Sequence, residues 1–169
     1  MAIRDALLAE LDQEMATTRS LLAIVPEADA AWKPHPKSMS LGELAVHLSN
    51  LLYWGIVTVR DAGFDLAPSG QPAWTPPKFE TTAGNLKTFD ANLAQAKQAL
   101  SGASDEALMQ PWSLRKGAEA YFTMPKVVVW RTFVMNHLIH HRAQLSVYLR
   151  MNDIAIPGMY GPSADEAGG

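Results

Sequence analysis

The sequence contains no cysteine among its 169 residues. This absence excludes disulfides, thiolate metal ligands and cysteine nucleophiles, so any metal ion would be bound by His, Asp, Glu or water. Charged residues are sparse, at 18% of the chain, the net charge is −3, and there is no cluster of basic residues. Because sequence-independent binding to nucleic acid needs many Lys and Arg contacts with phosphate, we expect no nucleic-acid partner.

Long hydrophobic runs are also missing. The longest apolar stretch, around residues 51–59, is much shorter than the roughly 20 residues that span a bilayer. The N-terminal residues carry charges throughout and have no apolar core of the kind found in signal peptides. We therefore expect a cytoplasmic protein with no membrane partner. The length and the 48% hydrophobic content predict one globular domain over residues 1–169.

Four segments have apolar residues at helical spacing, and they cover residues 3–24, 40–63, 82–100 and 125–151 approximately. Ser40 at the start of the second segment, with Glu43 three residues later, matches a capping box. This pattern predicts an all-α fold, an antiparallel four-helix bundle. A helical turn at residues 104–109 and a short hairpin near Gly117 are expected between the third and fourth helices. The first two connections are longer than a minimal bundle needs, and such loops are often functional.

Three of the five histidines, His137, His140 and His141, lie within five positions of the fourth segment. Residues four apart lie one above the other on a helix, so His137 and His141 share a face, which also carries Val134 and Leu145. Burying a polar ring nitrogen without a partner costs about 1–3 kcal/mol. A divalent metal held by one nitrogen from each ring would remove that cost.

His47 is the candidate for a third ligand, because it lies on the apolar face of the second segment between Leu44 and Leu51. If the second and fourth helices are neighbours, His47 meets the pair across the bundle core, where bundles build metal sites. The pattern is equally compatible with core histidines that have satisfied hydrogen bonds. We expect His35, between two prolines, at the surface, and His140 at the rim of the site.

Acidic residues are missing where two common metal motifs need them. Leu138 follows His137 in place of the glutamate of the zinc-protease HExxH motif. Asp and Glu are absent from the interior of the fourth segment, which excludes a di-iron carboxylate bundle.

The segment NHLIHHRAQLSVYLR, followed by NDIAIPGMYGPSADE, resembles the C-terminal signature of the DinB family in the wider DinB/YfiT-like group. The family pattern is NHxxHHRGQLxxYLR, then Pro, then YGPSADE, and this chain differs at Ala143, where Gly is common. The resemblance implies a four-helix bundle that is often a homodimer. It also implies a divalent transition metal, such as zinc, nickel or iron, bound by His47, His137 and His141.

The resemblance further implies an enzyme with a small-molecule substrate, because the group includes S-transferases that use low-molecular-weight thiols such as bacillithiol or mycothiol. In this hypothesis the metal holds the thiol as thiolate. Apolar walls that include Trp54 and Trp130 would then receive the electrophile, although core packing also explains each tryptophan.

Two alternatives are a metal-dependent hydrolase and a non-catalytic, metal-stabilised stress-response bundle. Hydrolysis requires a general base near the metal, and Glu43 is the carboxylate nearest His47 on the helix face, although a capping role suits it better. A non-catalytic site would have four protein ligands, completed by His140 or His35.

The sequence also indicates structural roles for five further polar residues. We expect Arg142 in a surface or interface ion pair. Gln144 and Tyr148 are either donors near the site or a satisfied polar pair in the core. Asp165 and Glu166 are expected to fix the C-terminus, either to the bundle or to a second subunit.

Overall fold

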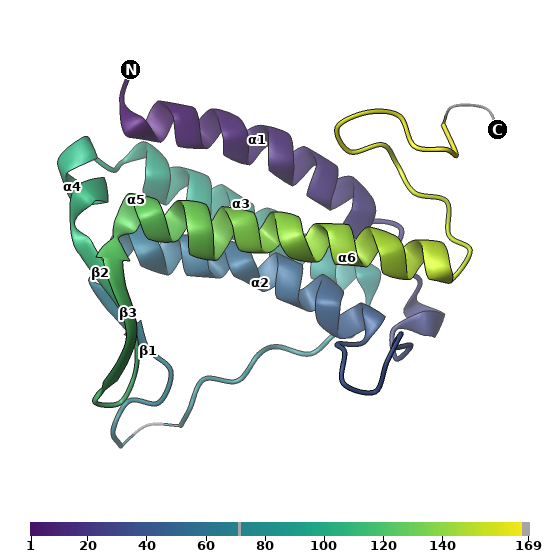
Figure 1. The fold of residues 1–169 in the computed structure, drawn as a ribbon, viewed down its shortest axis with the longest axis horizontal. Coiled ribbons are helices and arrows are strands. Elements are labelled where there is room, and N and C mark those ends of the chain that lie inside the picture. The colour runs from purple at the N-terminus through teal and green to yellow at the C-terminus, as the bar shows by residue number, and fades with distance from the viewer. Residues whose placement is uncertain (71, 167–169) are drawn as a thin grey trace.

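The computed structural model of the chain describes residues 1–70 and 72–166, most of which are helical (Figure 1). The long helices are α1 (Ile3–Leu22), α2 (Leu41–Arg60) and α3 (Thr82–Ser101). The fourth long run is continuous and consists of α5 (Lys126–Val129), the π-helical stretch η2 (Trp130–Asn136) and α6 (His137–Met151). Two short elements, η1 (Glu27–Asp29) and α4 (Asp105–Met109), lie in the connections. The four predicted helices and the predicted helical turn are therefore present.

A small sheet covers the end of the bundle where α2 ends and α5 begins (Figure 1). Its strands, β1 (Gly63–Asp65), β2 (Pro111–Lys116) and β3 (Glu119–Pro125), lie in the order β1-β2-β3. β2 and β3 form the predicted antiparallel hairpin, whose turn contains Gly117 at a φ of 60°. Glycine adopts this left-handed conformation without steric cost. β1 pairs with β2 in parallel, a third strand that the expected all-α fold lacked.

α1 and α3 pack antiparallel, as residues early in one helix contact residues late in the other. Lys97 forms an ion pair with Asp12 at 2.7 Å, and Arg19 binds Asp90 through two hydrogen bonds of 2.8 Å. α2 and the run η2–α6 are also antiparallel neighbours, because Gly55 lies against Trp130, whereas His47, earlier in α2, lies against His137, later in the other run.

α2 and α3 run parallel, which corrects the expectation of a bundle with only antiparallel neighbours. The side chain of Asn85 donates to the Ala45 carbonyl, and that of Asn92, two turns further along α3, donates to the Ser49 carbonyl. The parallel arrangement is possible because the connection from β1 to α3 is long. It returns along the whole bundle, below α2 in Figure 1, to the end at which α2 begins.

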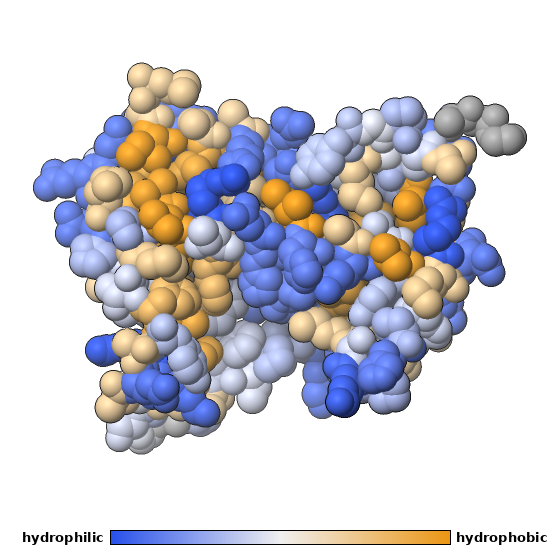
Figure 2. All heavy atoms as spheres, in the orientation of Figure 1, coloured by the Kyte–Doolittle hydropathy of each residue, from blue (hydrophilic) through white to orange (hydrophobic). Residues whose placement is uncertain are grey.

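The hydrophobic core fills the space between the four helical runs and continues under the sheet. Fully buried residues come from each long helical run and from β2, including Leu11 in α1, Leu48 in α2, Phe89 in α3, Trp112 in β2 and Leu145 in α6. Figure 2 shows a mixed surface on which hydrophobic atoms gather at the end where α1 begins and α5 lies. Within the described residues, no helix combines the length and hydropathy needed to cross a bilayer.

Candidate metal centre

α2 positions His47 near the middle of the bundle. The capping box predicted at its start is confirmed: the Glu43 amide donates to Ser40 Oγ at 3.1 Å, and Glu43 Oε2 accepts from the Ser40 amide at 2.7 Å. These bonds satisfy two amide groups that lack partners within the helix. His47 lies one turn further along, half-buried between the fully buried Leu44 and Leu51.

His137 and His141 project from the first turns of α6 toward His47. The π-helical stretch that precedes them is a rare element, and such stretches are frequent at functional sites. Here the backbone N–H of His137 donates to the Val134 carbonyl. The Phe133 carbonyl lies 3.2 Å from Nδ1 of the His137 side chain.

The three imidazole rings form a compact triangle, with centroids 4.5 Å apart for His47 and His141, 4.7 Å for His137 and His141, and 5.0 Å for His47 and His137. One nitrogen of each ring lies within 4.8 Å of the other two. His47 Nε2 and His137 Nε2 are 3.3 Å apart. Ligand nitrogens about 2.0–2.1 Å from a tetrahedral zinc ion are themselves separated by about 3.3 Å.

Hydrogen bonds fix the orientation of two of the rings. His137 Nδ1 faces the Phe133 carbonyl, and His141 Nδ1 faces the amide oxygen of Gln144 at 2.7 Å. Both partners are acceptors, so each Nδ1 carries the proton and each Nε2 has a free lone pair. Histidines that bind metals usually donate their second N–H in this way. The three residues therefore fit a divalent metal ion.

The protonation state of the cluster also suits metal binding. Burial, with repulsion from His141 and His137 as smaller causes, lowers the pKa of His47 to about 4. Burial is also the main cause that lowers the pKa of His137 and of His141. The rings are therefore neutral at pH 7, and neutral imidazole is the form that binds a metal.

Aromatic side chains line one side of the cluster. The ring of Phe133 lies 5.8 Å from that of His137, and Trp54 meets Phe133 edge-on at 5.7 Å. Trp54 is buried in the core and reaches the cluster only through Phe133, so core packing, the alternative left open by the sequence, accounts for it. Trp130 does not line the site, because it is fully buried against Gly55. Phe133 was missed, although its position four residues before His137 places it on the same helix face.

The two remaining histidines are not part of the cluster. His140 is exposed, and its ring lies 4.9 Å from that of His141, which agrees with the rim position expected for it. His35 is exposed in the loop before α2, where its Nδ1 accepts from the Lys37 amide at 3.1 Å. Within the described residues, the group able to bind a metal comprises three histidines and no fourth protein ligand.

Arg142 is in an ion pair, but the expected surface or interface position is wrong. Its side chain is 1% exposed and lies 2.6 Å from Glu14, which is buried in α1. The Tyr160 hydroxyl accepts from Arg142 at 2.7 Å and lies 3.0 Å from both carboxylate oxygens of Glu14. The Arg142 side chain points away from His141, as predicted. It points toward Glu14 in α1, however, and not toward solvent.

Other polar residues from the sequence analysis now have defined contacts. Gln144 contacts His141 directly, whereas Tyr148 packs edge-on against Trp32 at 5.5 Å. The C-terminal segment is fixed to its own bundle: Asp165 binds Arg150 through two hydrogen bonds, and Glu166 accepts from the amides of residues 158 and 163.

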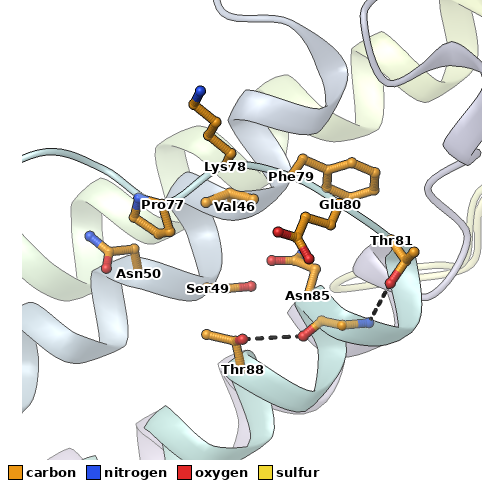
Figure 3. Close-up of a pocket in the computed structure, with 11 residues that line it drawn as sticks. Val46, Ser49, Asn50, Pro77, Lys78, Phe79, Glu80, Thr81, Asn85 and Thr88 are labelled. Carbon is orange, nitrogen blue, oxygen red and sulfur yellow. Dashed lines mark hydrogen bonds between the residues drawn. The ribbon is translucent and has the colours of Figure 1, made fainter.

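Two pockets lie beside α2, on either side of Val46, Asn50 and Pro77, which line both of them. The first has a volume of about 240 Å³ and opens between α2 and the start of α3, where Glu80 and Asn85 point toward each other (Figure 3). None of the three clustered histidines lines this pocket. The second pocket has a volume of about 320 Å³ and is lined by His47.

Comparisons with known proteins agree with this architecture. A DinB-like protein from Bacillus subtilis superposes with a TM-score of 0.67 at 16% identity, covering 91% of this chain and 96% of that one. A DinB-like protein from Bacillus cereus gives a TM-score of 0.63 at 22% identity, covering 94% and 98%. No curated protein has a significant sequence match. The family model of the DinB superfamily matches residues 10–145, which is most of the chain, and the protein therefore belongs to the DinB superfamily.

Proposed function

We propose that this protein is a metal-dependent enzyme in which His47, His137 and His141 bind one divalent transition metal ion. The observation that carries the proposal is the convergence of three neutral imidazoles, two of which donate Nδ1–H to a fixed acceptor. Zinc, nickel and iron all suit a set of imidazole ligands. Three protein ligands leave a coordination position for a substrate atom.

We further propose a thiol-dependent S-transferase as the reaction. A metal in this position lowers the pKa of a bound thiol, so that thiolate is available at neutral pH. In the transfer a sulfur–carbon bond forms, the bond from that carbon to its leaving group breaks, and the thiol proton passes to solvent. The partly buried ring of Phe133 supports this reaction, because it lies beside His137 and offers an apolar contact to an electrophile there.

The contacts of Glu43 give little support to the hydrolase alternative. Its carboxylate accepts from the Ser40 amide and forms an ion pair with Lys33 at 3.1 Å. The bond to the Ser40 backbone, together with Lys33, lowers the pKa of Glu43, which makes it a weaker base. A set of three ligands also favours an enzyme over a purely structural metal site, which would be closed by a fourth ligand.

The first test is the metal content of purified wild-type protein, His141→Ala and His35→Ala. His35→Ala is the matched control, because that residue is exposed in a loop. We expect about one transition metal ion per chain in the wild type and the control, and a large loss in His141→Ala. Equal metal content in all three, or none after incubation with zinc or nickel, would contradict the site.

The S-transferase proposal has its own assay. Metal-loaded protein is mixed with a low-molecular-weight thiol and chlorodinitrobenzene, and release of chloride with formation of the thioether is followed. We expect conjugation that depends on both the metal and His141. If the rate equals that of the uncatalysed reaction for every thiol and electrophile in a panel, the S-transferase proposal is wrong.

The cellular setting is part of the same proposal. We propose that the chain is one domain over residues 1–169 and acts on a small molecule in the cytoplasm as a homodimer. Light scattering of the purified protein measures the oligomeric state, and a mass of about 18 kDa per particle would exclude the dimer, since one chain has a mass of 18.4 kDa.

A further inference from the structure

The pocket beside His47 is formed by the start of α2 with the loop that precedes it and by a segment about 30 residues further along the chain. Residues 37–39 of the loop before α2, the first turns of α2, and Pro76 and Pro77 of the long connection enclose about 320 Å³. His47 lines this pocket and also belongs to the histidine cluster. A molecule held here therefore lies against one of the proposed metal ligands.

Much of the pocket wall is apolar. Met39, Val46, Pro76 and Pro77 contribute apolar side chains, and Met39 is 38% exposed. Such a wall gains free energy by covering an apolar part of a ligand. Pockets for small molecules generally combine walls of this kind with a few polar groups that fix the orientation of the ligand.

The charged side chains at the pocket leave one positive charge without a partner. Glu43 is already bound by Lys33 and by the Ser40 amide. Lys37 also lines the pocket, and within the described residues its ammonium group forms no ion pair. The turn that carries Lys37 is held by His35, which accepts from its amide.

We propose that this pocket binds an anionic small molecule, with its apolar part against Met39, Val46 and the two prolines and its anionic group beside Lys37. The inference rests on the proposed function, as it assigns a substrate class to the same site. Because Glu43 is neutralised by Lys33, Lys37 sets the preference for charge. A neutral or cationic analogue of equal size is expected to bind more weakly.

The first experiment compares three thiols of equal length on protein loaded with cobalt, which gives a thiolate-to-metal absorption band in the near ultraviolet. The probes are mercaptopropionate, mercaptopropanol and mercaptopropylamine, which are anionic, neutral and cationic. We expect mercaptopropionate to bind at least about fivefold more tightly than mercaptopropylamine, the effect of one charge interaction at a partly exposed site. In Lys37→Glu this order is lost or reversed, whereas Lys87→Glu, on the exposed face of α3, retains it.

A second experiment needs no metal. Phenylpropionate and phenylpropylamine are titrated into the protein, and the methyl signal of Met39 is followed by NMR. We expect the carboxylate to shift this signal at lower concentration than the amine, and Lys37→Glu to abolish the difference. If cobalt does not bind but this preference is found, the metal proposal fails and the pocket proposal stands.

Two results overturn the inference. One is equal binding of anionic and cationic probes to the wild type in both experiments. The other is a preference for the anion that Lys37→Glu and Lys87→Glu reduce equally, since it would then reflect the charge of the whole protein and not of this pocket.

Discussion

At the scale of single residues, the second ring nitrogen decides what each histidine can do. An imidazole that donates from Nδ1 to a fixed acceptor presents Nε2 as a lone pair in a defined direction. His137 obtains its acceptor from the backbone of the π-helical stretch, and His141 obtains it from the side chain of Gln144. Only the second of these acceptors can be removed by a substitution.

We predict that Gln144→Leu weakens metal binding by about 10–100-fold, because it removes the acceptor that orients the His141 ring. Competition with a chelator of known affinity measures the change. Gln95→Leu on the exposed surface of α3 is the control and is expected to bind like the wild type. An unchanged affinity in Gln144→Leu would show that the ring is oriented without this bond.

The buried ion pair gives a prediction about stability. Glu14→Gln leaves Arg142 buried without its counter-charge, and we expect the free energy of unfolding to fall by about 3 kcal/mol. Unfolding in urea measures this change. Glu10→Gln removes a more exposed ion pair with Arg131 and is expected to cost less than about 1 kcal/mol. Similar losses in the two variants would contradict the role assigned to burial.

At the scale of secondary-structure elements, the geometry of the histidine cluster depends on how closely α2 approaches the π-helical stretch. Gly55 in α2 permits this approach, as a Cβ there would lie 2.9 Å from Cζ3 of Trp130. Trp130 is fully buried, so the ring that a new Cβ would meet belongs to the packed core. The same contact sets the spacing of the helices that carry His47 and His137.

Gly55→Ala should therefore destabilise the protein by about 1–3 kcal/mol through overpacking, although alanine favours helices. Gly102→Ala, where the nearest atom to a new Cβ is 3.7 Å away, is the control, with an expected change within about 0.5 kcal/mol. Thermal unfolding of both variants makes the comparison. A Gly55→Ala protein as stable as the control would mean that the two helices can separate without cost.

At the scale of the whole molecule, the C-terminal segment joins α1 and α6, which run parallel at this contact. Tyr160 reaches the ion pair of Glu14 and Arg142, and Asp165 binds Arg150 and the Ile156 amide. The C-terminal segment therefore binds to the helices of its own chain. The sequence alone left open whether this tail contacts its own bundle or a second subunit.

The tail contact has a predictable pH dependence. Hydrogen bonds from Arg150, with a smaller effect of the Ile156 amide, lower the pKa of Asp165 from 3.8 to about 2. A carboxyl whose pKa is lowered by folding stabilises the folded state above its unfolded pKa, and this contribution disappears as the pH falls toward the folded value. The difference in stability between wild type and Asp165→Asn should be complete above about pH 5 and should be lost as the pH falls through about 2.

The NMR signal of the Ile156 amide tests this prediction directly, because its hydrogen bond ends on Asp165. We expect the signal to titrate with a midpoint near the folded pKa of about 2 in the wild type and to lose this transition in Asp165→Asn. A midpoint at the ordinary value of 3.8 would show that the contact with Arg150 does not persist in solution.

The sequence by itself determined the four helices, the capping box at Ser40, the hairpin near Gly117 and the three histidines of the cluster. These features depend on local spacing: a helix places His137 and His141 on one face whatever surrounds them. Phe133 was accessible to the same reasoning, as it lies on that face, but no pattern distinguishes it from a core residue.

Only the tertiary structure decided the features that depend on contacts between distant segments. The parallel course of α2 and α3, the pairing of β1 with β2, and the burial of Arg142 against Glu14 join residues far apart in the chain. The pocket beside His47 likewise needs a loop, a helix and two prolines in one place. Periodicity within a segment fixes which face a residue lies on, but it carries no information about which distant segment packs against that face.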